Sequence, residues 1–266
     1  MKSGFKITCD NMSVNYYLGD ELVNNLVGDH CHDRFEITYH LSVSAKYIVE
    51  GGEYQATRGS LILINPMAYH RVELEPDGQT EAYTVYFTRS ALAESVADML
   101  DGISADSESR GRLYCAGLTS DALVSVFDRF ELAERLSEKE RRVYMQALLS
   151  EIIILLSVAE GERAVVPEDE LGARVARYLN ANFRKNISLD KLARRFFVSK
   201  YHLCRAFKSY SGISVHAYVN RKRIIYAKGL IESGLTAAGA AEKVGYGDYS
   251  AFYRAYVKIV GKSPTA

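Results

Sequence analysis

The stretch Ala206-Phe-Lys-Ser-Tyr-Ser-Gly-Ile-Ser214 is matched 49 residues later by Ala255-Tyr-Val-Lys-Ile-Val-Gly-Lys-Ser263. Upstream, Leu192-Ala-Arg-Arg-Phe196 is matched by Ala240-Ala-Glu-Lys-Val244, at an offset of 48. The one-residue difference falls between the two matches, where a turn can absorb it. Each copy therefore predicts a short helix, a tight turn and a second helix, which is the helix-turn-helix arrangement.

The second helix of each copy has an apolar face and a polar face. Leu203, Ala206, Phe207 and Tyr210 follow helical spacing and are expected to be buried, with Ser199 as the N-cap. Polar, basic and aromatic side chains take the other face: Tyr201, Cys204, Arg205 and Lys208 in the first copy, and Ser250, Tyr253 and Arg254 in the second. Any solvated helix has a polar stripe, but its repetition in a basic region favours insertion into a DNA groove.

Charge is distributed unevenly along the chain. It has 33 Lys and Arg and 33 Asp and Glu, yet residues 168–266 hold 18 basic against 7 acidic residues, and residues 1–167 hold 15 against 26. A basic region beside an acidic one indicates a polyanionic partner. Together with the repeated motif, this predicts double-stranded DNA as the partner of the C-terminal region.

Residues 214–233 predict one long helix between the two motifs. A rigid helix would hold two recognition helices about 34 Å apart, so that they enter successive major grooves on one face of DNA. Basic and hydroxyl side chains nearby are expected to contact phosphates and set the register. These candidates are Ser188, Lys191, Arg194, Arg195, Ser199, Lys200, Lys208, Arg221, Lys222 and Lys262.

The N-terminal region is predicted to be rich in strands, followed by helices. Short runs of β-branched and aromatic residues at 35–41, 45–49, 60–65, 71–75 and 82–88 are separated by Gly and Pro turns, which is typical of a sandwich or small barrel. Residues 120–136 and 138–160 predict helices. The expected fold is a two-domain α+β chain: residues 1–160, a linker at 161–169, and an all-α DNA-binding domain at 170–266.

In its C-terminal region the chain resembles the AraC/XylS family of bacterial transcription regulators. The resemblance covers roughly residues 170–264 and rests on Ser188-Leu-Asp-Lys-Leu-Ala193, Ser199-Lys-Tyr-His-Leu-Cys-Arg-Ala-Phe-Lys208, Gly212, Tyr218 to Arg223, Ala227, Val244-Gly-Tyr246, Ser250-Ala-Phe-Tyr-Arg254, Gly261 and Ser263-Pro264. It implies sequence-specific DNA binding that activates or represses transcription, contact with RNA polymerase, and a homodimer; of the two signs of regulation, activation is the one expected. It also implies that Tyr201, Cys204, Arg205, Ser250, Tyr253 and Arg254 face the bases.

The second motif departs from the family pattern in its first helix. Gly239 and Ala240 stand where a larger aliphatic residue is usual. We therefore expect looser packing there, and the first motif to lead in sequence recognition.

His30-Cys-His-Asp-Arg-Phe-Glu36, Gly59-Ser-Leu-Ile-Leu-Ile-Asn-Pro66 and His70 resemble a cupin barrel. In regulators of this kind such a domain binds a small-molecule effector. The candidate effector-binding residues are His30, His32, Glu36, Tyr39, Tyr47, Arg58, Asn65, His70 and Tyr86.

A divalent transition metal is a second possible occupant of the barrel. On an extended strand His30, His32 and Glu36 share one face, and His70 from a later strand could join them. Three imidazoles and one carboxylate suit such an ion. The resemblance favours a metal-free barrel and a chain that is not an enzyme and requires no cofactor. The alternatives are a cupin metalloenzyme with a helical accessory domain and a regulator without an effector.

The cysteines and the apolar runs indicate where the protein acts. Cys9, Cys31, Cys115 and Cys204 form no CxxC pair or disulfide framework, and no apolar run reaches the length of about 18 residues that crosses a bilayer. No apolar stretch follows Lys2 and Lys6, so a secretory signal is not expected. We therefore expect a cytoplasmic protein without a membrane partner.

Overall fold

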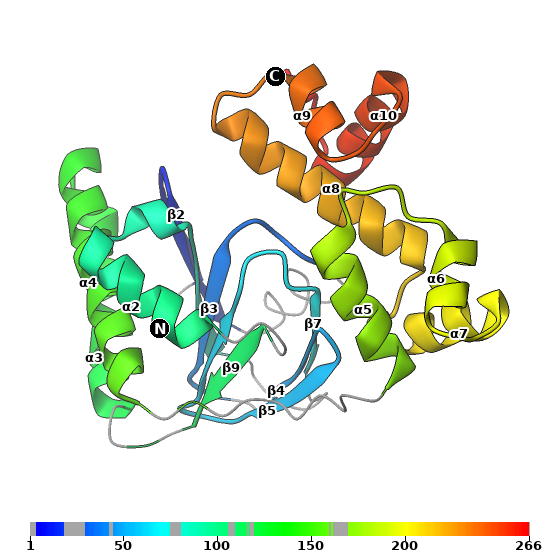
Figure 1. The fold of residues 1–266 in the computed structure, drawn as a ribbon. Helices are drawn as coiled ribbons and strands as arrows, with labels where there is room; N and C mark the ends of the chain where they lie inside the picture. Colours follow the sequence, from blue (N-terminus) through cyan, green and yellow to red (C-terminus); the bar gives the residue numbers. More distant parts are fainter. Residues whose placement is uncertain are drawn as a thin grey trace. The chain divides into compact units, whose positions relative to one another are not determined.

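A computed structural model describes residues 4–18, 30–42, 45–74, 81–105, 110–115, 117, 120–159, 161 and 170–265. The chain divides into two compact units, one built mainly from residues up to 165 and the other mainly from residues after it. The first contains every strand of the described residues, and the second is helical (Figure 1). In the described part of the chain, no helix has the length and apolar character needed to span a membrane.

The first unit contains two antiparallel sheets. The larger has the order β1-β2-β8-β3-β6-β9 and the smaller the order β5-β4-β7. The strands are β1 (Phe5–Cys9), β2 (Met12–Leu18), β3 (Phe35–His40), β4 (Ala45–Val49), β5 (Gly52–Ala56), β6 (Leu61–Ile64), β7 (His70–Leu74), β8 (Glu81–Phe87) and β9 (Gly111–Tyr114).

The five strands expected from the sequence are confirmed to within one residue at each end, as β3, β4, β6, β7 and β8. Strands β1, β2, β5 and β9 were not expected. The expected barrel is corrected in one respect, because the two sheets of the described residues do not join into a closed barrel.

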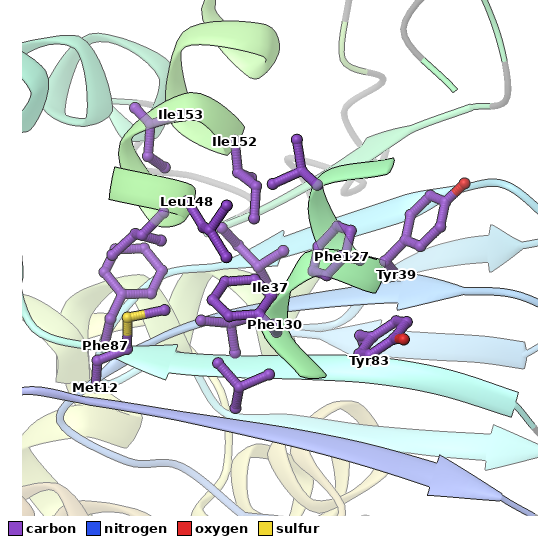
Figure 2. Packing of buried hydrophobic residues seen from close by; sticks show 14 of the residues in the cluster. Met12, Ile37, Tyr39, Tyr83, Phe87, Phe127, Phe130, Leu148, Ile152 and Ile153 are labelled. Carbon is purple, nitrogen blue, oxygen red and sulfur yellow. The ribbon is translucent and has the colours of Figure 1, made fainter. Parts of the chain in front are cut away.

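The two faces of the larger sheet are covered by different layers. Along β3, Ile37 and Tyr39 point to a core that also contains Phe127 and Phe130, and Figure 2 shows these side chains packed between the strands and the helices. The opposite face carries Glu36 and the other even-numbered residues of β3. This alternation follows from the period of two along a strand, and both faces are buried.

Helices cover the first of these faces. They are α2 (Glu94–Ser104), α3 (Ser120–Arg129) and α4 (Glu138–Val158), with short 3₁₀ turns η1 (Arg89–Ala91) and η2 (Phe130–Arg135). Ser137 and Glu140 form a capping box at the start of α4. The apolar side of α4, including Leu148 and Ile152, packs on its own sheet (Figure 2).

The second unit consists of six helices in the described residues: α5 (Leu171–Asn182), α6 (Leu189–Arg195), α7 (Lys200–Ser211), α8 (Val215–Glu232), α9 (Ala237–Lys243) and α10 (Tyr249–Val260). The pairs α6–α7 and α9–α10 are the two predicted motifs, and α8 joins them as one continuous helix (Figure 1). Side-chain caps begin five of these helices, since Ser188, Ser199, Ser214, Thr236 and Asp248 accept hydrogen bonds from backbone N–H groups.

The turns inside the two motifs have the same backbone hydrogen bonds. Val198 N donates to Ala193 O at 3.0 Å, and Tyr246 N donates to Ala241 O at 3.0 Å. Such a helix ending needs one residue in the left-handed region, usually glycine. The second motif uses Gly245, with φ +84°, whereas the first uses Phe197, with φ +55°. A residue with a Cβ loses about 1–2 kcal/mol in this conformation.

Candidate functional site

Helix α7 buries one face and exposes the other, as its spacing predicts. Leu203 and Phe207 are fully buried, and the Phe207 ring meets Tyr218 of α8 edge-on, with ring centroids 5.2 Å apart. On the other face, Tyr201 is 76% exposed and Arg205 is also exposed. The first turn is anchored by Ser199, whose Oγ accepts a hydrogen bond from His202 N at 3.1 Å. The capped end of the helix thus presents donors and an aromatic ring to solvent.

Helix α10 repeats this arrangement. Phe252 and Tyr256 are buried against α8 and α9, while Ser250, Tyr253 and Arg254 are exposed. Ala240 of α9 is fully buried in the same cluster, and looser packing of α9 stays a prediction.

Most of the predicted phosphate contacts lie at the surface. Ser188 is partly exposed and caps α6. Arg221 is also partly exposed. Lys200 Nζ lies 2.8 Å from Asp190 Oδ1, an exposed pair that lowers the pKa of Asp190. The exposed candidates are Lys191, Arg194, Arg195, Ser199, Lys200, Lys208 and Lys262.

Lys222 is a correction to that prediction. Its side chain is only 1% exposed, and Nζ donates a hydrogen bond to Oδ1 of Asn180 and lies 4.9 Å from the ring centroid of Tyr218. It therefore supports the helical core and cannot meet a phosphate. The spacing already carried this signal, because Lys222 stands four and seven residues after Tyr218 and Val215, both of which are buried.

A layer of buried polar side chains lines the face of the larger sheet that carries Glu36. Three adjacent strands contribute to it, because Asn15 of β2 pairs with Thr84 of β8, and Thr84 pairs with Thr38 of β3. On β3, Glu36, Thr38 and His40 alternate with the apolar residues of the other face. All three are 0% exposed. Apolar side chains of the smaller sheet, including Val49 and Val72, are buried in the cluster on this side.

Hydrogen bonds connect part of this polar layer. Thr38 Oγ1 donates to Glu36 Oε1 at 3.1 Å and lies 3.1 Å from Thr84 Oγ1. A further bond of 3.0 Å joins His40 Nε2 and the Tyr47 hydroxyl. Two buried polar atoms of the layer have no hydrogen-bond partner within the described part of the chain, Asn15 Oδ1 and His40 Nδ1. Buried polar atoms of this kind are where a ligand or ordered water is expected to bind.

The two buried histidines of the layer differ in their surroundings. His70 Nε2 lies 3.3 Å from Glu36 Oε2, and Nδ1 lies 3.0 Å from Ala68 O. Burial opposes protonation of His70, but hydrogen bonding to Glu36 and its negative charge outweigh burial and raise the pKa. Burial dominates at His40 and lowers its pKa to about 4, against a smaller opposing effect of Glu36. His40 is therefore neutral at physiological pH.

The four predicted metal ligands are divided between the two units. Glu36 and His70 lie together in the first unit, whereas His30 and His32 lie in the segment Asp29–Asp33, which belongs with the second unit. The His30 and His32 rings are partly exposed, with centroids 6.0 Å apart. The donor set is compatible with a divalent transition ion.

Three other predicted effector residues lie elsewhere. Tyr39 points to the helical side of the sheet, where it stacks on Phe127 with ring centroids 4.9 Å apart. Arg58 is an exposed turn residue. Asn65 Nδ2 donates to Ser104 O at 2.9 Å, which ties the end of β6 to the end of α2. Tyr47 and Tyr86 lie beside the polar layer. Burial is the main cause that raises the pKa of both hydroxyls, and the negative charge of Glu36 raises it further.

Sequence reasoning missed four members of the polar layer: Asn15, Thr38, His40 and Thr84. For Thr38 and His40 a signal existed, because they follow Glu36 at the period of two.

Comparisons with known proteins agree with this architecture. Residues 17–163 match the family described as AraC-like ligand binding domain, and residues 192–266 match a helix-turn-helix domain. The HTH-type transcriptional regulator YbfI of Bacillus subtilis (strain 168) is 28% identical over 233 residues, which cover 84% of this chain and 80% of YbfI. YdiP of Escherichia coli (strain K12), also an HTH-type transcriptional regulator, is 23% identical over 248 residues, covering 90% of this chain and 80% of YdiP.

Among solved structures, ToxT from Vibrio cholerae O395 is similar with a TM-score of 0.40 and 13% identity, covering 96% of this chain and 96% of ToxT. The family matches and the two regulators define the class of the chain: a transcription regulator with an N-terminal ligand-binding domain and a C-terminal helix-turn-helix DNA-binding domain. The chain belongs to the AraC family.

Proposed function

We propose that this regulator activates transcription from a specific DNA site that α7 and α10 read together, and that a small molecule bound by the polar layer controls it. The observation that carries the DNA-binding assignment is the duplicated recognition face. In both motifs a capped second helix buries at least one aromatic residue and exposes one arginine, Arg205 or Arg254, beside an exposed tyrosine. Arginine pairs bidentately with guanine O6 and N7, and an α-helix fits the major groove.

Base reading is assigned to Tyr201, Cys204, Arg205, Ser250, Tyr253 and Arg254. The assignment is tested by selecting a preferred duplex from random DNA with the full chain and measuring affinities for its single-base variants. Arg205→Ala should weaken binding to the selected duplex by about 1–3 kcal/mol and relax the preference at one base pair. Lys139→Ala, which removes an exposed charge at the start of α4, is the control and should change neither quantity. An unchanged base preference in Arg205→Ala would exclude Arg205 from base reading.

Phosphate contacts are assigned to the exposed cations and hydroxyls around the first motif, represented by Lys208. Removing a phosphate contact weakens binding to every sequence, because it changes counterion release and not base readout. Lys208→Ala should therefore weaken binding to specific and random DNA alike and reduce the salt slope by about one. If binding to random DNA kept its full salt dependence, Lys208 would not touch the backbone.

The effector is assigned to the polar layer because Asn15 Oδ1 and His40 Nδ1 are buried there without partners in the described residues. We propose that an uncharged or cationic molecule with hydrogen-bond donors binds there, since a buried carboxylate, Glu36, would repel an anion. From the predicted set we keep Glu36, Tyr47, His70 and Tyr86, which all belong to the first unit. His30 and His32 belong with the second unit and are kept only as proposed metal ligands.

A divalent metal ion is the second candidate occupant, favoured by the ligand types of the predicted set, three imidazoles and one carboxylate from His30, His32, Glu36 and His70. Metal analysis of the purified chain and of His32→Ala distinguishes the two candidates. Stoichiometric metal that is lost in His32→Ala would establish a metal site and favour the metalloenzyme alternative. A chain that neither purifies with metal nor gains thermal stability with added Zn²⁺ would leave the organic effector as the occupant.

Several features of the proposed regulator derive from the family. We propose a homodimer that contacts RNA polymerase and acts in the cytoplasm, where bacterial DNA lies, without catalytic activity. We also propose domain boundaries at 1–160 and 170–266 with a linker at 161–169, a segment that lies almost entirely outside the described residues. Limited proteolysis at the linker and sedimentation of the intact chain test these two proposals.

A further inference from the structure

Phe197 is the most exposed large apolar side chain of the described residues. It lies in the turn between α6 and α7, and 94% of its surface is accessible to solvent. Its neighbours on either side, Phe196 and Val198, are only partly exposed. The Phe197 ring therefore contributes almost nothing to the apolar core of its unit.

The backbone of Phe197 is also strained. Its φ is +55°, in a position where the second motif has Gly245 with the same hydrogen-bonding pattern. In the second motif glycine is required, because a Cβ would lie 2.2 Å from the carbonyl oxygen of Arg184. In the first motif glycine would relieve strain and remove no packing. Backbone strain that packing does not explain motivates the hypothesis that the side chain contacts another molecule.

The surroundings of Phe197 identify the class of that molecule. The segment from Ser188 to Lys208 contains six Lys and Arg and a single carboxylate, Asp190, so the surface around the turn is strongly cationic. The turn also leads directly into the N-terminal end of α7, the end of a recognition helix that meets base edges. A cationic surface with one projecting apolar ring fits DNA better than an apolar protein surface.

We propose that Phe197 packs against the 5-methyl group of a thymine at the edge of the site that α7 reads. The methyl group is the only apolar group that bases present in the major groove, and a phenyl ring can contact it but cannot make a directional hydrogen bond. The inference rests on the proposed DNA-binding function. It adds a base-reading residue in the turn, outside the two recognition helices.

The test uses the duplex selected by the full-length wild-type chain, in which each thymine is replaced in turn by uracil, which lacks the methyl group. One such replacement should weaken wild-type binding by about 4-fold, the equivalent of the ~0.8 kcal/mol of one buried methyl-sized group. Phe197→Gly and Phe197→Asn, both suited to the left-handed turn, should bind the thymine duplex at least 4-fold more weakly and lose sensitivity to that replacement. Their melting temperatures should equal or exceed that of the wild type. Val143→Ala, which trims an exposed apolar residue of α4, is the matched control and should behave as wild type.

Each other outcome overturns the inference in a recognisable way. Unchanged affinity with lost transcription activation would assign Phe197 to a protein partner such as RNA polymerase. A lower melting temperature in both variants would assign it a structural role, and weaker binding with no sensitive thymine would exclude the methyl contact. If the wild-type chain selected no sequence at all, the proposed function would fail with it, whereas failure of the Phe197 variants alone leaves that function standing.

Discussion

His40 and His70 show how two buried histidines near one carboxylate acquire opposite protonation behaviour. His70 faces Glu36 directly at 3.3 Å, so its charged form has a compensating partner. His40 instead bonds to the neutral hydroxyl of Tyr47, and burial lowers its pKa to about 4. A charge at His40 would be desolvated without a nearby hydrogen-bonding anion.

The lowered pKa of His40 predicts acid sensitivity of the N-terminal unit. The unfolded chain takes up this proton near its ordinary pKa of about 6.5, while the folded chain resists until about pH 4. The stability that neutral His40 provides is therefore fully present above pH 6.5 and is lost as the pH falls towards 4. Between pH 7 and pH 5 the loss should reach about 2 kcal/mol.

His40→Gln should remove this dependence, since glutamine cannot titrate and can still bond to Tyr47. Denaturant unfolding at pH 7 and pH 5 provides the measurement, with His202→Gln on the exposed face of α7 as the control. The wild type and the control should lose stability on acidification by the same amount. If His40→Gln lost as much, some other group would be responsible for the acid sensitivity.

At the scale of elements, two glycines in helices of the C-terminal unit have opposite packing environments. A Cβ on Gly172 of α5 would lie 2.3 Å from Tyr210 Cβ and 3.0 Å from Ala206 O, so the absence of a side chain lets α5 pack closely on α7. A Cβ on Gly229 of α8 would meet nothing within 4 Å.

Alanine at these two positions should therefore shift stability in opposite directions. Gly172→Ala should destabilise the chain by about 1–3 kcal/mol through forced separation of packed backbones. Gly229→Ala should stabilise it by about 0.5–1 kcal/mol, because alanine has less backbone entropy to lose. Urea unfolding followed by far-ultraviolet circular dichroism measures both. Equal effects of the two substitutions would mean that α5 and α7 do not approach as closely as described.

Elements with a strong local pattern were predictable, and those fixed by tertiary pairing were not. The repeat predicted the helix pairs α6–α7 and α9–α10, and residues 214–233 predicted α8 to within one residue at each end, because caps and apolar spacing agree there. Strand β9 has only four residues and lies in a region where the sequence pattern is helical. It is a strand because it pairs with β6, and this pairing cannot be read from the local sequence. In the site, Tyr39 and Glu36 are three positions apart on one strand, so they cannot share a face, and predicting both in one pocket was inconsistent.

At the scale of the whole molecule, the region that binds the ligand and the region that binds DNA differ in the sign of their net charge. The acidic residues 1–167 and the basic residues 168–266 carry excess charge of opposite sign. The two-domain organisation followed from this asymmetry and from the change of pattern after the strands. The sheet arrangement did not follow, because neither strand lengths nor turns determine whether two sheets join into a barrel.

The continuous helix α8 predicts that the DNA site has a fixed spacing. Its 18 residues span about 27 Å and hold the two motifs as one rigid pair, so one chain should contact two successive major grooves. Inserting five base pairs between the two half-sites turns one of them to the opposite face of the duplex. Affinity should then fall to that of a single half-site.

Arg254→Ala provides the internal control for this spacing experiment. On the original duplex it should weaken binding, and on the duplex with five inserted base pairs it should have no further effect, because α10 has already lost its half-site. Equilibrium titration of both duplexes with both proteins measures this coupling. Equal weakening by Arg254→Ala on the two duplexes would show that the motifs move independently and that α8 does not set their separation.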